Sequence, residues 1–348
     1  MLCAREHHVS IEAFERGPAG RRTHAGRFLV DCTAGGSTNE RIGPASYDGP
    51  VARVSLIRRN RFIYNPNTMD TVGRLRYLFW AAPRILNADT TCPACKEPGT
   101  VLVKRKYLVT ALYRCPSCEV MFRVPKPSAE ELNEFYQTDY KQGVTMDCPS
   151  PEELAKLIAS SFAGTWMDFA KYIEVLRAIP IAPGGSILDF GSSWGYGSWQ
   201  LRQAGYKVYS SELSAPRARY SVEKLGCDLL DIKDLPEKVD CLFAAHVIEH
   251  LTNPRDIWEI ARDIVKPGGN VVLFLPNGAP EREPVFKDYH KIWGLVHPLL
   301  LSPVALARMG ERFGFKVHCH TSPYTAQEIA KKTPGAKTGS ELLAVGYL

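Results

Sequence analysis

Residues 187–191 (ILDFG) constrain the fold more than any other segment of this sequence. Their apolar side chains predict a short buried strand that ends at Gly191, and Gly195 and Gly197 follow before a helical stretch. Glycine is needed where a backbone turns sharply or approaches a ligand closely, and the N-terminus of the following helix adds hydrogen-bond donors. The pattern therefore predicts a nucleotide-type ligand at the carboxyl end of a parallel strand.

From Ile181 onward, short apolar runs alternate with helical stretches, as in a parallel-sheet α/β domain. In the helix after the fourth strand, Asn253 is the expected N-cap and Pro254 the first residue. The predicted fold class is therefore α/β and Rossmann-like. We expect strands near residues 186–190, 207–211, 228–230, 240–245, 270–275, 315–319 and 342–348.

The spacing of the glycines argues against a dinucleotide. That fingerprint needs G-x-G-x-x-G, and Ser193 stands at the position of its middle glycine. Glu212 instead ends the second strand, 23 residues after Asp189. An acid at this place can accept hydrogen bonds from both ribose hydroxyls. The alternative interpretation is a solvent-exposed surface glutamate.

A second carboxylate follows the third strand. Asp231 could accept a hydrogen bond from an adenine amino group, and the neighbouring Ile232 could pack on the ring. Asp234, three residues further on, is the competing candidate. Together with the glycine loop, these residues predict a nucleoside site.

At this point the chain resembles the class I S-adenosylmethionine-dependent methyltransferases, and especially the subgroup with the ubiquinone-biosynthesis O-methyltransferases. The resemblance covers about residues 183–348 and implies a methyl-transferring enzyme. It also implies a seven-stranded methyltransferase sheet whose last strand, residues 341–348, runs antiparallel. The motifs occur in the same order as in that family: residues 187–191, Glu212, residues 231–236 (DIKDLP), 246–251 (HVIEHL), 265–269 (VKPGG) and 276–277 (PN).

The resemblance also assigns the cofactor residues. It implies that the loop from Asp189 to Gly195 holds the methionine moiety of S-adenosylmethionine, Glu212 the ribose, and Asp231 with Ile232 the adenine. Ser192 and Ser193 replace a common Cys-Gly pair. The predicted cofactor site comprises Asp189, Gly191, Ser193, Gly195, Glu212, Asp231, Ile232 and His246.

One motif admits another interpretation. His246, Glu249 and His250 match the H-x-x-E-H pattern of some zinc peptidases. Those histidines must share one helix face, whereas His246 is expected at a strand end, before the helix begins. The methyltransferase interpretation is therefore favoured.

Four cysteines form a C-x-x-C…C-x-x-C pattern with 19 residues between the pairs. Two such knuckles supply four thiolates for a tetrahedral, structural zinc ion with no open position. The apolar residues between them suit a β-hairpin, so we expect an N-terminal four-cysteine zinc ribbon over residues 91–127. The ribbon is expected to act as a scaffold or as a wall of the substrate pocket. The predicted ligands are Cys92, Cys95, Cys115 and Cys118.

The remaining segments complete the domain prediction. Residues 128–182 contain two capping boxes, at Ser128 and Ser150, and predict a helical linker or cap. The methyltransferase domain follows over residues 183–348, with a substrate-cap insertion near 279–300. Residues 1–69 hold ten arginines and no lysine. They predict a disordered leader, or upstream sequence ahead of a start at Met69, in preference to a basic arm for nucleic acid or an acidic partner.

The insertion supplies the candidates for catalysis. It carries His290 and His297, either of which could remove a proton from the methyl acceptor, while His250 is a weaker candidate. Methyl transfer that relies on positioning alone needs no base. The atom that accepts the methyl group is not encoded in the fold.

Composition gives no support for a nucleic-acid partner or a membrane span. The net charge is +6, too weak to argue for nucleic acid, and no run of 18 apolar residues predicts a membrane span. The expected location is the cytoplasm, because six scattered cysteines lack disulfide-framework spacing. The favoured function is methylation of a small molecule, such as a sugar or an intermediate of polysaccharide or secondary metabolism. The alternatives are an RNA methyltransferase guided by the ribbon and a non-enzymatic zinc-ribbon interaction protein.

Overall fold

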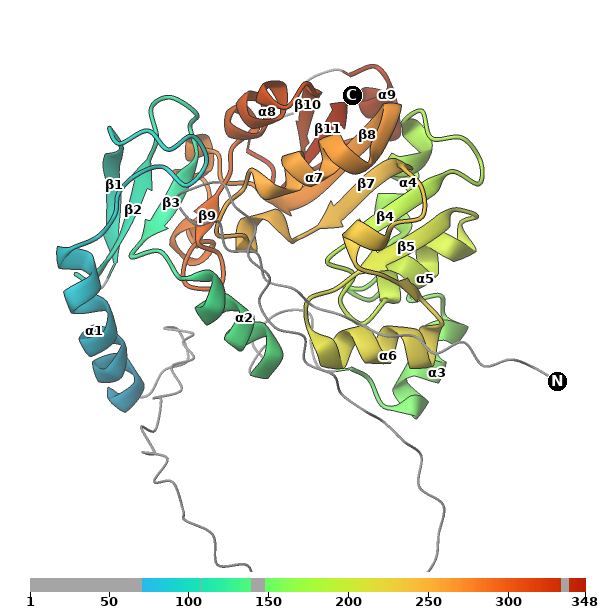
Figure 1. Cartoon of the computed structure of the whole chain (residues 1–348), viewed down its shortest axis with the longest axis horizontal. Helices are drawn as coiled ribbons and strands as arrows, with labels where there is room; N and C mark the ends of the chain where they lie inside the picture. The colour runs from blue at the N-terminus through green and yellow to red at the C-terminus, as the bar shows by residue number, and fades with distance from the viewer. Residues whose placement is uncertain (1–70, 107, 139–147, 333–337) are drawn as a thin grey trace, which may run out of the picture. The chain divides into compact units, whose positions relative to one another are not determined.

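The strands predicted in the C-terminal half form one seven-stranded sheet, in the order β10-β11-β8-β7-β4-β5-β6 (Figure 1). The computed structural model describes residues 71–106, 108–138, 148–332 and 338–348, so the predicted leader lies outside the described residues. The strands are β4 (Ser186–Phe190), β5 (Lys207–Ser211), β6 (Asp228–Leu229), β7 (Val239–Ala245), β8 (Val265–Pro276), β10 (Lys316–Thr321) and β11 (Glu341–Tyr347).

The directions of the strands determine which loops lie at the same edge of the sheet. β4, β5, β6, β7 and β8 pair in parallel, while β11 pairs antiparallel with both β8 and β10. The antiparallel last strand and the α/β fold class are thus confirmed. Because parallel strands end at the same edge, the loops after β4, β5, β7 and β8 lie close together. Glu341, the first residue of β11, is paired with Pro276 and therefore reaches that edge too.

Successive residues of the central strands face opposite sides of the sheet, as the period of two requires. Leu188, Leu242 and Leu273 pack in one apolar cluster with Ile257 and Trp258. The neighbouring residues of the same strands enter a second cluster with α4 (Ala170–Ala178) and α9 (Ala326–Ala330). Both faces are therefore covered, which explains why the strands read as nearly continuous apolar runs.

The other helices of this half follow their sequence signals, with one exception. They are α5 (Tyr196–Gln203), α6 (Ala215–Leu225), α7 (Asp256–Ile264) and α8 (Pro303–Arg312). The prediction that Asn253 caps α7 and that Pro254 begins it was wrong, because the helix starts at Asp256. The side chain of Asn253 accepts a hydrogen bond from the Arg255 amide instead. A local side-chain turn thus competes successfully with helix initiation.

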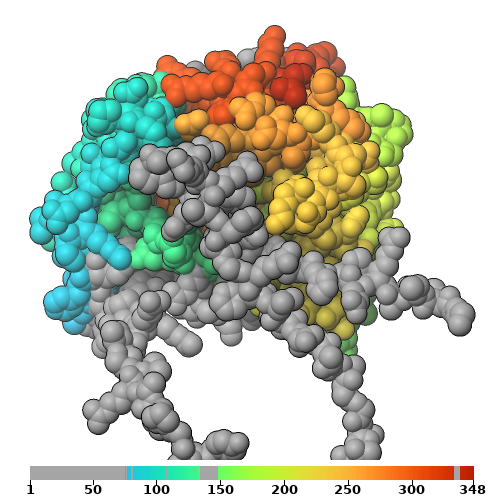
Figure 2. Space-filling model, in the orientation of Figure 1, coloured from blue at the N-terminus to red at the C-terminus, as the bar shows by residue number. Residues whose placement is uncertain are grey.

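A second sheet joins the cysteine-containing segment, residues 91–127, to the insertion near residues 279–300. It has the order β1-β2-β3-β9 and consists of β1 (Val101–Lys106), β2 (Thr110–Arg114), β3 (Met121–Val124) and β9 (Leu299–Leu300). The hairpin expected between the two cysteine knuckles is thus β1 and β2. β9 belongs to the insertion, and it pairs with β3 through Met121 and Phe122. In Figure 2 the cyan atoms of the ribbon accordingly lie against the C-terminal half.

Three further helices lie in the N-terminal half: α1 (Thr71–Leu86), α2 (Ala129–Thr138) and α3 (Pro151–Ala159). Both predicted capping boxes are present. The Ser128 and Ser150 hydroxyls accept from the amides three residues on, and the glutamates at those positions accept from the serine amides. None of the described helices is long and apolar enough to cross a membrane.

Candidate functional site

The tight turn after β4, called here the glycine cradle, has two positions that only glycine permits. Gly191 has φ +77°, and an added Cβ would lie 2.6 Å from a methyl group of Val247. Gly195 has φ +89°, and its Cβ would lie 2.6 Å from the Cys227 sulfur and 2.7 Å from the Ser221 Cβ. A side chain at either position would therefore meet both backbone strain and a clash. The two glycines therefore allow the loop to turn sharply and to pack closely against Val247, Ser221 and Cys227.

Two polar side chains at this loop, Asp189 and Ser192, are buried. Asp189 is 3% exposed and accepts a hydrogen bond from the Ser198 hydroxyl at 2.6 Å. Burial raises the pKa of Asp189 to about 7, although the bond from Ser198 opposes this shift. The Ser192 hydroxyl is buried and has no hydrogen-bond partner among the described residues. A polar ligand in the cradle would satisfy it.

Glu212 stands directly after β5, beside the same loop. Its carboxylate accepts hydrogen bonds from the backbone amides of Ser193 at 2.8 Å and Ser214 at 2.7 Å. Burial raises the pKa of Glu212, while these backbone bonds and the nearby Arg217 oppose the shift. The carboxylate is thus fixed at the edge of the glycine cradle, where ribose hydroxyls could reach its remaining lone pairs.

The predicted adenine residues lie after β6. Asp231 is exposed and caps a 3-10 helix, Ile232–Asp234, by accepting a hydrogen bond from the Lys233 amide at 3.2 Å. Ile232 is half-buried and packs against the main apolar cluster. The cradle, the orphan Ser192 hydroxyl and the fixed Glu212 carboxylate together suit a nucleoside cofactor such as S-adenosylmethionine.

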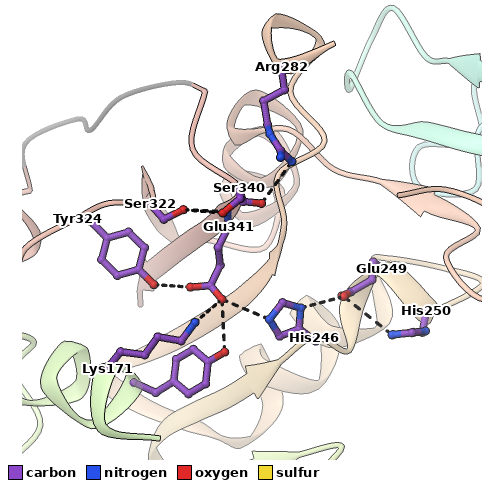
Figure 3. Close-up of polar contacts among 10 residues, drawn as sticks. Lys171, His246, Glu249, His250, Arg282, Ser322, Tyr324, Ser340 and Glu341 are labelled. Carbon is purple, nitrogen blue, oxygen red and sulfur yellow. Dashed lines mark hydrogen bonds and ion pairs between the residues drawn. The ribbon is translucent and has the colours of Figure 1, made fainter. Parts of the chain in front are cut away.

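A polar network around His246 and Glu341 lies at the ends of β7 and β8 (Figure 3). His246 follows β7 and adopts φ +57°. Its Nε2 lies 3.3 Å from Glu341 Oε2, and its Nδ1 lies 3.5 Å from Glu249 Oε1. Burial lowers the pKa of His246, but the two neighbouring carboxylates outweigh it and raise the pKa to about 9. His246 is therefore a cation at neutral pH.

Glu341 is the centre of that network. It accepts hydrogen bonds from Lys171 at 2.8 Å, from the Tyr324 hydroxyl at 2.7 Å and from the Tyr172 hydroxyl at 3.4 Å. Burial raises the pKa of Glu341, and the bonds from His246 and Lys171 more than compensate, so that it falls to about 2. No local pattern in the sequence indicates Glu341, because only strand pairing brings the first residue of β11 to this edge.

The insertion adds His297 to this edge but leaves His290 apart. The rings of His297 and His250 lie 4.5 Å apart at 76°, and both approach the buried Glu249. His290 is exposed on the 3-10 helix Tyr289–Lys291. Of the two histidines predicted to be catalytic, His297 is thus the one that lies beside the H-x-x-E-H segment.

The four predicted zinc ligands converge. The Cys92 and Cys118 sulfurs lie 3.5 Å apart, those of Cys95 and Cys115 lie 3.4 Å apart, and all four sulfurs lie within 4.8 Å of one another. Both knuckles also share one backbone pattern: the amide four residues after the first cysteine donates to the carbonyl of that cysteine. Four converging thiols in two matching turns suit one zinc ion.

Further contacts join the ribbon to the insertion at residues 279–300. Besides the β3–β9 pairing, the Arg123 amide donates to the Pro298 carbonyl at 2.7 Å. The Lys106 ammonium donates to the Trp293 carbonyl at 2.6 Å and lies 4.0 Å from the centroid of the Trp293 ring. Residues on either side of His297 are therefore held by the ribbon.

This topology and site agree with a comparison against protein families. Residues 166–320 match the family described as a methyltransferase domain. The matched segment contains most of the seven-stranded sheet. The resemblance to methyltransferases drawn from the sequence motifs is thus confirmed, while the ubiquinone-biosynthesis subgroup stays a prediction.

Two curated relatives are uncharacterized methyltransferases of Geobacillus. The protein from Geobacillus kaustophilus (strain HTA426) is 29% identical over 114 residues, which is 30% of this chain and 53% of the relative. The protein from Geobacillus thermodenitrificans (strain NG80-2) is 30% identical over the same shares. The chain spans about half the length of the curated relatives it matches.

Solved structures with similar chains are also methyltransferases. Phosphoethanolamine N-methyltransferase 2 of Haemonchus contortus, in complex with S-adenosyl-L-methionine, has 16% identity and a TM-score of 0.44 over 65% of this chain and 61% of that chain. A possible histamine N-methyltransferase of Thermotoga maritima has 18% identity and a TM-score of 0.38 over 56% of this chain and 94% of that chain.

Proposed function

We propose that this chain is an S-adenosylmethionine-dependent methyltransferase with a small-molecule acceptor, favouring a sugar or an intermediate of polysaccharide or secondary metabolism. The observation that carries the proposal is the glycine cradle at Gly191 and Gly195, with Glu212 fixed at its rim, inside a methyltransferase domain. The cofactor, when bound, supplies an electrophilic methyl group on sulfur.

The protein's own contribution is to align the acceptor with that methyl group and to exclude water. The loop at residues 191–195 would hold the methionine end, Glu212 the ribose, and Asp231 with Ile232 the adenine. The acceptor would approach from the edge formed by His246, with the insertion around His297 as its cover. The zinc ribbon would act as the scaffold of that cover, because β3 pairs directly with β9.

An RNA acceptor is the weaker candidate. The hairpin of β1 and β2 carries one basic cluster, Lys104 to Lys106, and two of its three side chains contact other residues of the chain. Lys104 forms an ion pair with Glu283, and Lys106 lies over Trp293. Arg105 is thus the one member of that cluster for which the described residues offer no such partner. A single cation falls short of a phosphate-binding platform.

Calorimetric titration of S-adenosylhomocysteine into the zinc-loaded full chain tests the proposal. We expect micromolar binding by the wild type, no binding of NAD, and loss of binding in Gly195→Ala. Gly205→Ala is the matched control, since Gly205 also has a positive φ (+95°) but its Cβ would meet nothing within 4 Å. Absence of binding by the folded wild type would refute the proposal and favour a non-enzymatic zinc-ribbon protein.

The acceptor class needs a second assay. Binding of RNA that weakens steeply with salt would favour an RNA substrate, because phosphate contacts release counterions. We expect instead no such binding, and methyl transfer from labelled cofactor into a small-molecule fraction.

A further inference from the structure

Glu249 is a buried carboxylate that lacks hydrogen bonds. Its side chain is 4% exposed, and neither oxygen has a hydrogen-bond partner among the described residues. The nearest nitrogens are His246 Nδ1 at 3.5 Å and His250 Nε2 at 3.9 Å from Oε1. A buried charge without hydrogen bonds is costly unless it is paired or coordinates a metal ion. His246 supplies a positive charge on one side, but both Glu249 oxygens retain lone pairs that suit a metal ion.

Two histidines beside Glu249 are oriented as metal ligands are. The Nδ1 atom of His250 lies 2.8 Å from the Val296 carbonyl oxygen, and that of His297 lies 3.3 Å from the Ile292 carbonyl oxygen. A carbonyl accepts but never donates, so each bond assigns the ring proton to Nδ1 and a lone pair to Nε2. Metal-binding histidines show this arrangement, in which a second hydrogen bond fixes the tautomer.

The three side chains converge on one point. Each offers one ligand atom, and these atoms all lie within 4.8 Å of one another. Ligands bound to one ion at about 2.0–2.1 Å lie closer together than that, so the ion would draw them inward. His297 belongs to the insertion, whose cover over this edge depends on the ribbon.

We propose that Glu249, His250 and His297 bind one divalent transition-metal ion, such as Zn²⁺, Fe²⁺ or Mn²⁺. Two imidazoles and one carboxylate suit these ions, whereas Mg²⁺ and Ca²⁺ prefer oxygen ligands alone. Three protein ligands leave coordination positions open for water or an acceptor oxygen, unlike the closed four-thiolate shell of the ribbon. The site is separate from the ribbon and does not require bound S-adenosylmethionine.

The same geometry shows why the H-x-x-E-H segment is not a peptidase site. In that motif both histidines bind the metal from one helix face and the glutamate acts as a base. Here His246 lies before the 3-10 helix Ile248–His250, and its Nε2 points to Glu341 (Figure 3). Glu249 is itself a ligand, and the second histidine ligand comes from the insertion.

Metal stoichiometry of the full chain tests this site. After chelation, the protein is titrated with Co²⁺ and then Zn²⁺, and bound metal is counted by mass spectrometry. Cobalt bound to the ribbon is detected by its thiolate-to-cobalt charge-transfer absorption. A site of histidines and a carboxylate lacks this absorption. We expect two ions in the wild type and one in His297→Ala, with the ribbon absorption unchanged.

Two further variants separate metal loss from misfolding. Glu249→Gln keeps the size of the side chain and should also retain one ion. His290→Ala, from the same insertion, is the matched control and should retain two. Once the ribbon holds its ion, further Zn²⁺ should raise the melting temperature of the wild type and His290→Ala but not that of His297→Ala. One ion in the wild type, or two in His297→Ala, would overturn the proposal, whereas S-adenosylhomocysteine binding is measured independently on the same variants.

Discussion

Replacing Glu212 with glutamine tests the cofactor site most directly. Both carboxylate oxygens now accept backbone hydrogen bonds, from Ser193 at 2.8 Å and Ser214 at 2.7 Å. Glutamine offers one oxygen and one NH₂ group, so one amide would face a donor and lose its bond. Hydrogen bonds to a charged group contribute about 1.5–3 kcal/mol each. Because the buried charge of Glu212 is removed as well, the net loss of folding stability should be smaller, about 1 kcal/mol.

Cofactor binding should suffer more than folding in this variant. Ribose hydroxyls that donate to a carboxylate would meet a neutral amide, and the loss of one charged hydrogen bond corresponds to roughly a 10- to 100-fold weaker Kd. Titration calorimetry with S-adenosylhomocysteine measures the Kd, and thermal unfolding measures stability. Glu223→Gln makes the same charge change on the exposed side of α6 and should bind like the wild type. An unchanged Kd in Glu212→Gln would refute the assignment of ribose to this residue.

Three further predictions concern stability. Burial raises the folded-state pKa of Asp189 from 3.8 to about 7, so the free energy of unfolding of the wild type should fall as pH rises from about 4 to 7. Asp189→Asn should remove up to about 4 kcal/mol of that pH dependence. Denaturant unfolding at several pH values measures it. Cys115→Ser should weaken Co²⁺ binding, reduce the thiolate-to-cobalt absorption and lower the melting temperature, because one of four sulfur ligands is lost; unchanged absorption and affinity would contradict the four-cysteine site. Phe122→Ala should lower the free energy of unfolding by about 3–5 kcal/mol, because Phe122 is 1% exposed in the core cluster that the ribbon shares with the seven-stranded sheet. The variant should still unfold in one cooperative transition, and two separate transitions would show that the ribbon folds independently.

The sequence was sufficient for the seven strands of the main sheet and for two helix N-terminal capping boxes. Period-two and period-3.6 patterns are local, and so are capping boxes and glycine turns, which is why the seven strands and the boxes at Ser128 and Ser150 could be predicted. The start of α7 could not, because a side-chain turn at Asn253 and a helix N-cap use the same residue type. The cysteine spacing likewise predicted a cluster that the structure brings together.

Only the tertiary structure determined which distant residues meet at the site. Glu341 reaches His246 because β11 runs antiparallel beside β8, and His297 reaches Glu249 because β9 pairs with the ribbon. Neither contact leaves a periodic trace in the sequence, since each joins residues that are far apart in the chain. Local sequence therefore determined the strands, the glycine loop and the thiol pairs. Strand pairing determined which side chains meet around His246, because hydrogen bonding between strands depends on register and direction across the whole sheet.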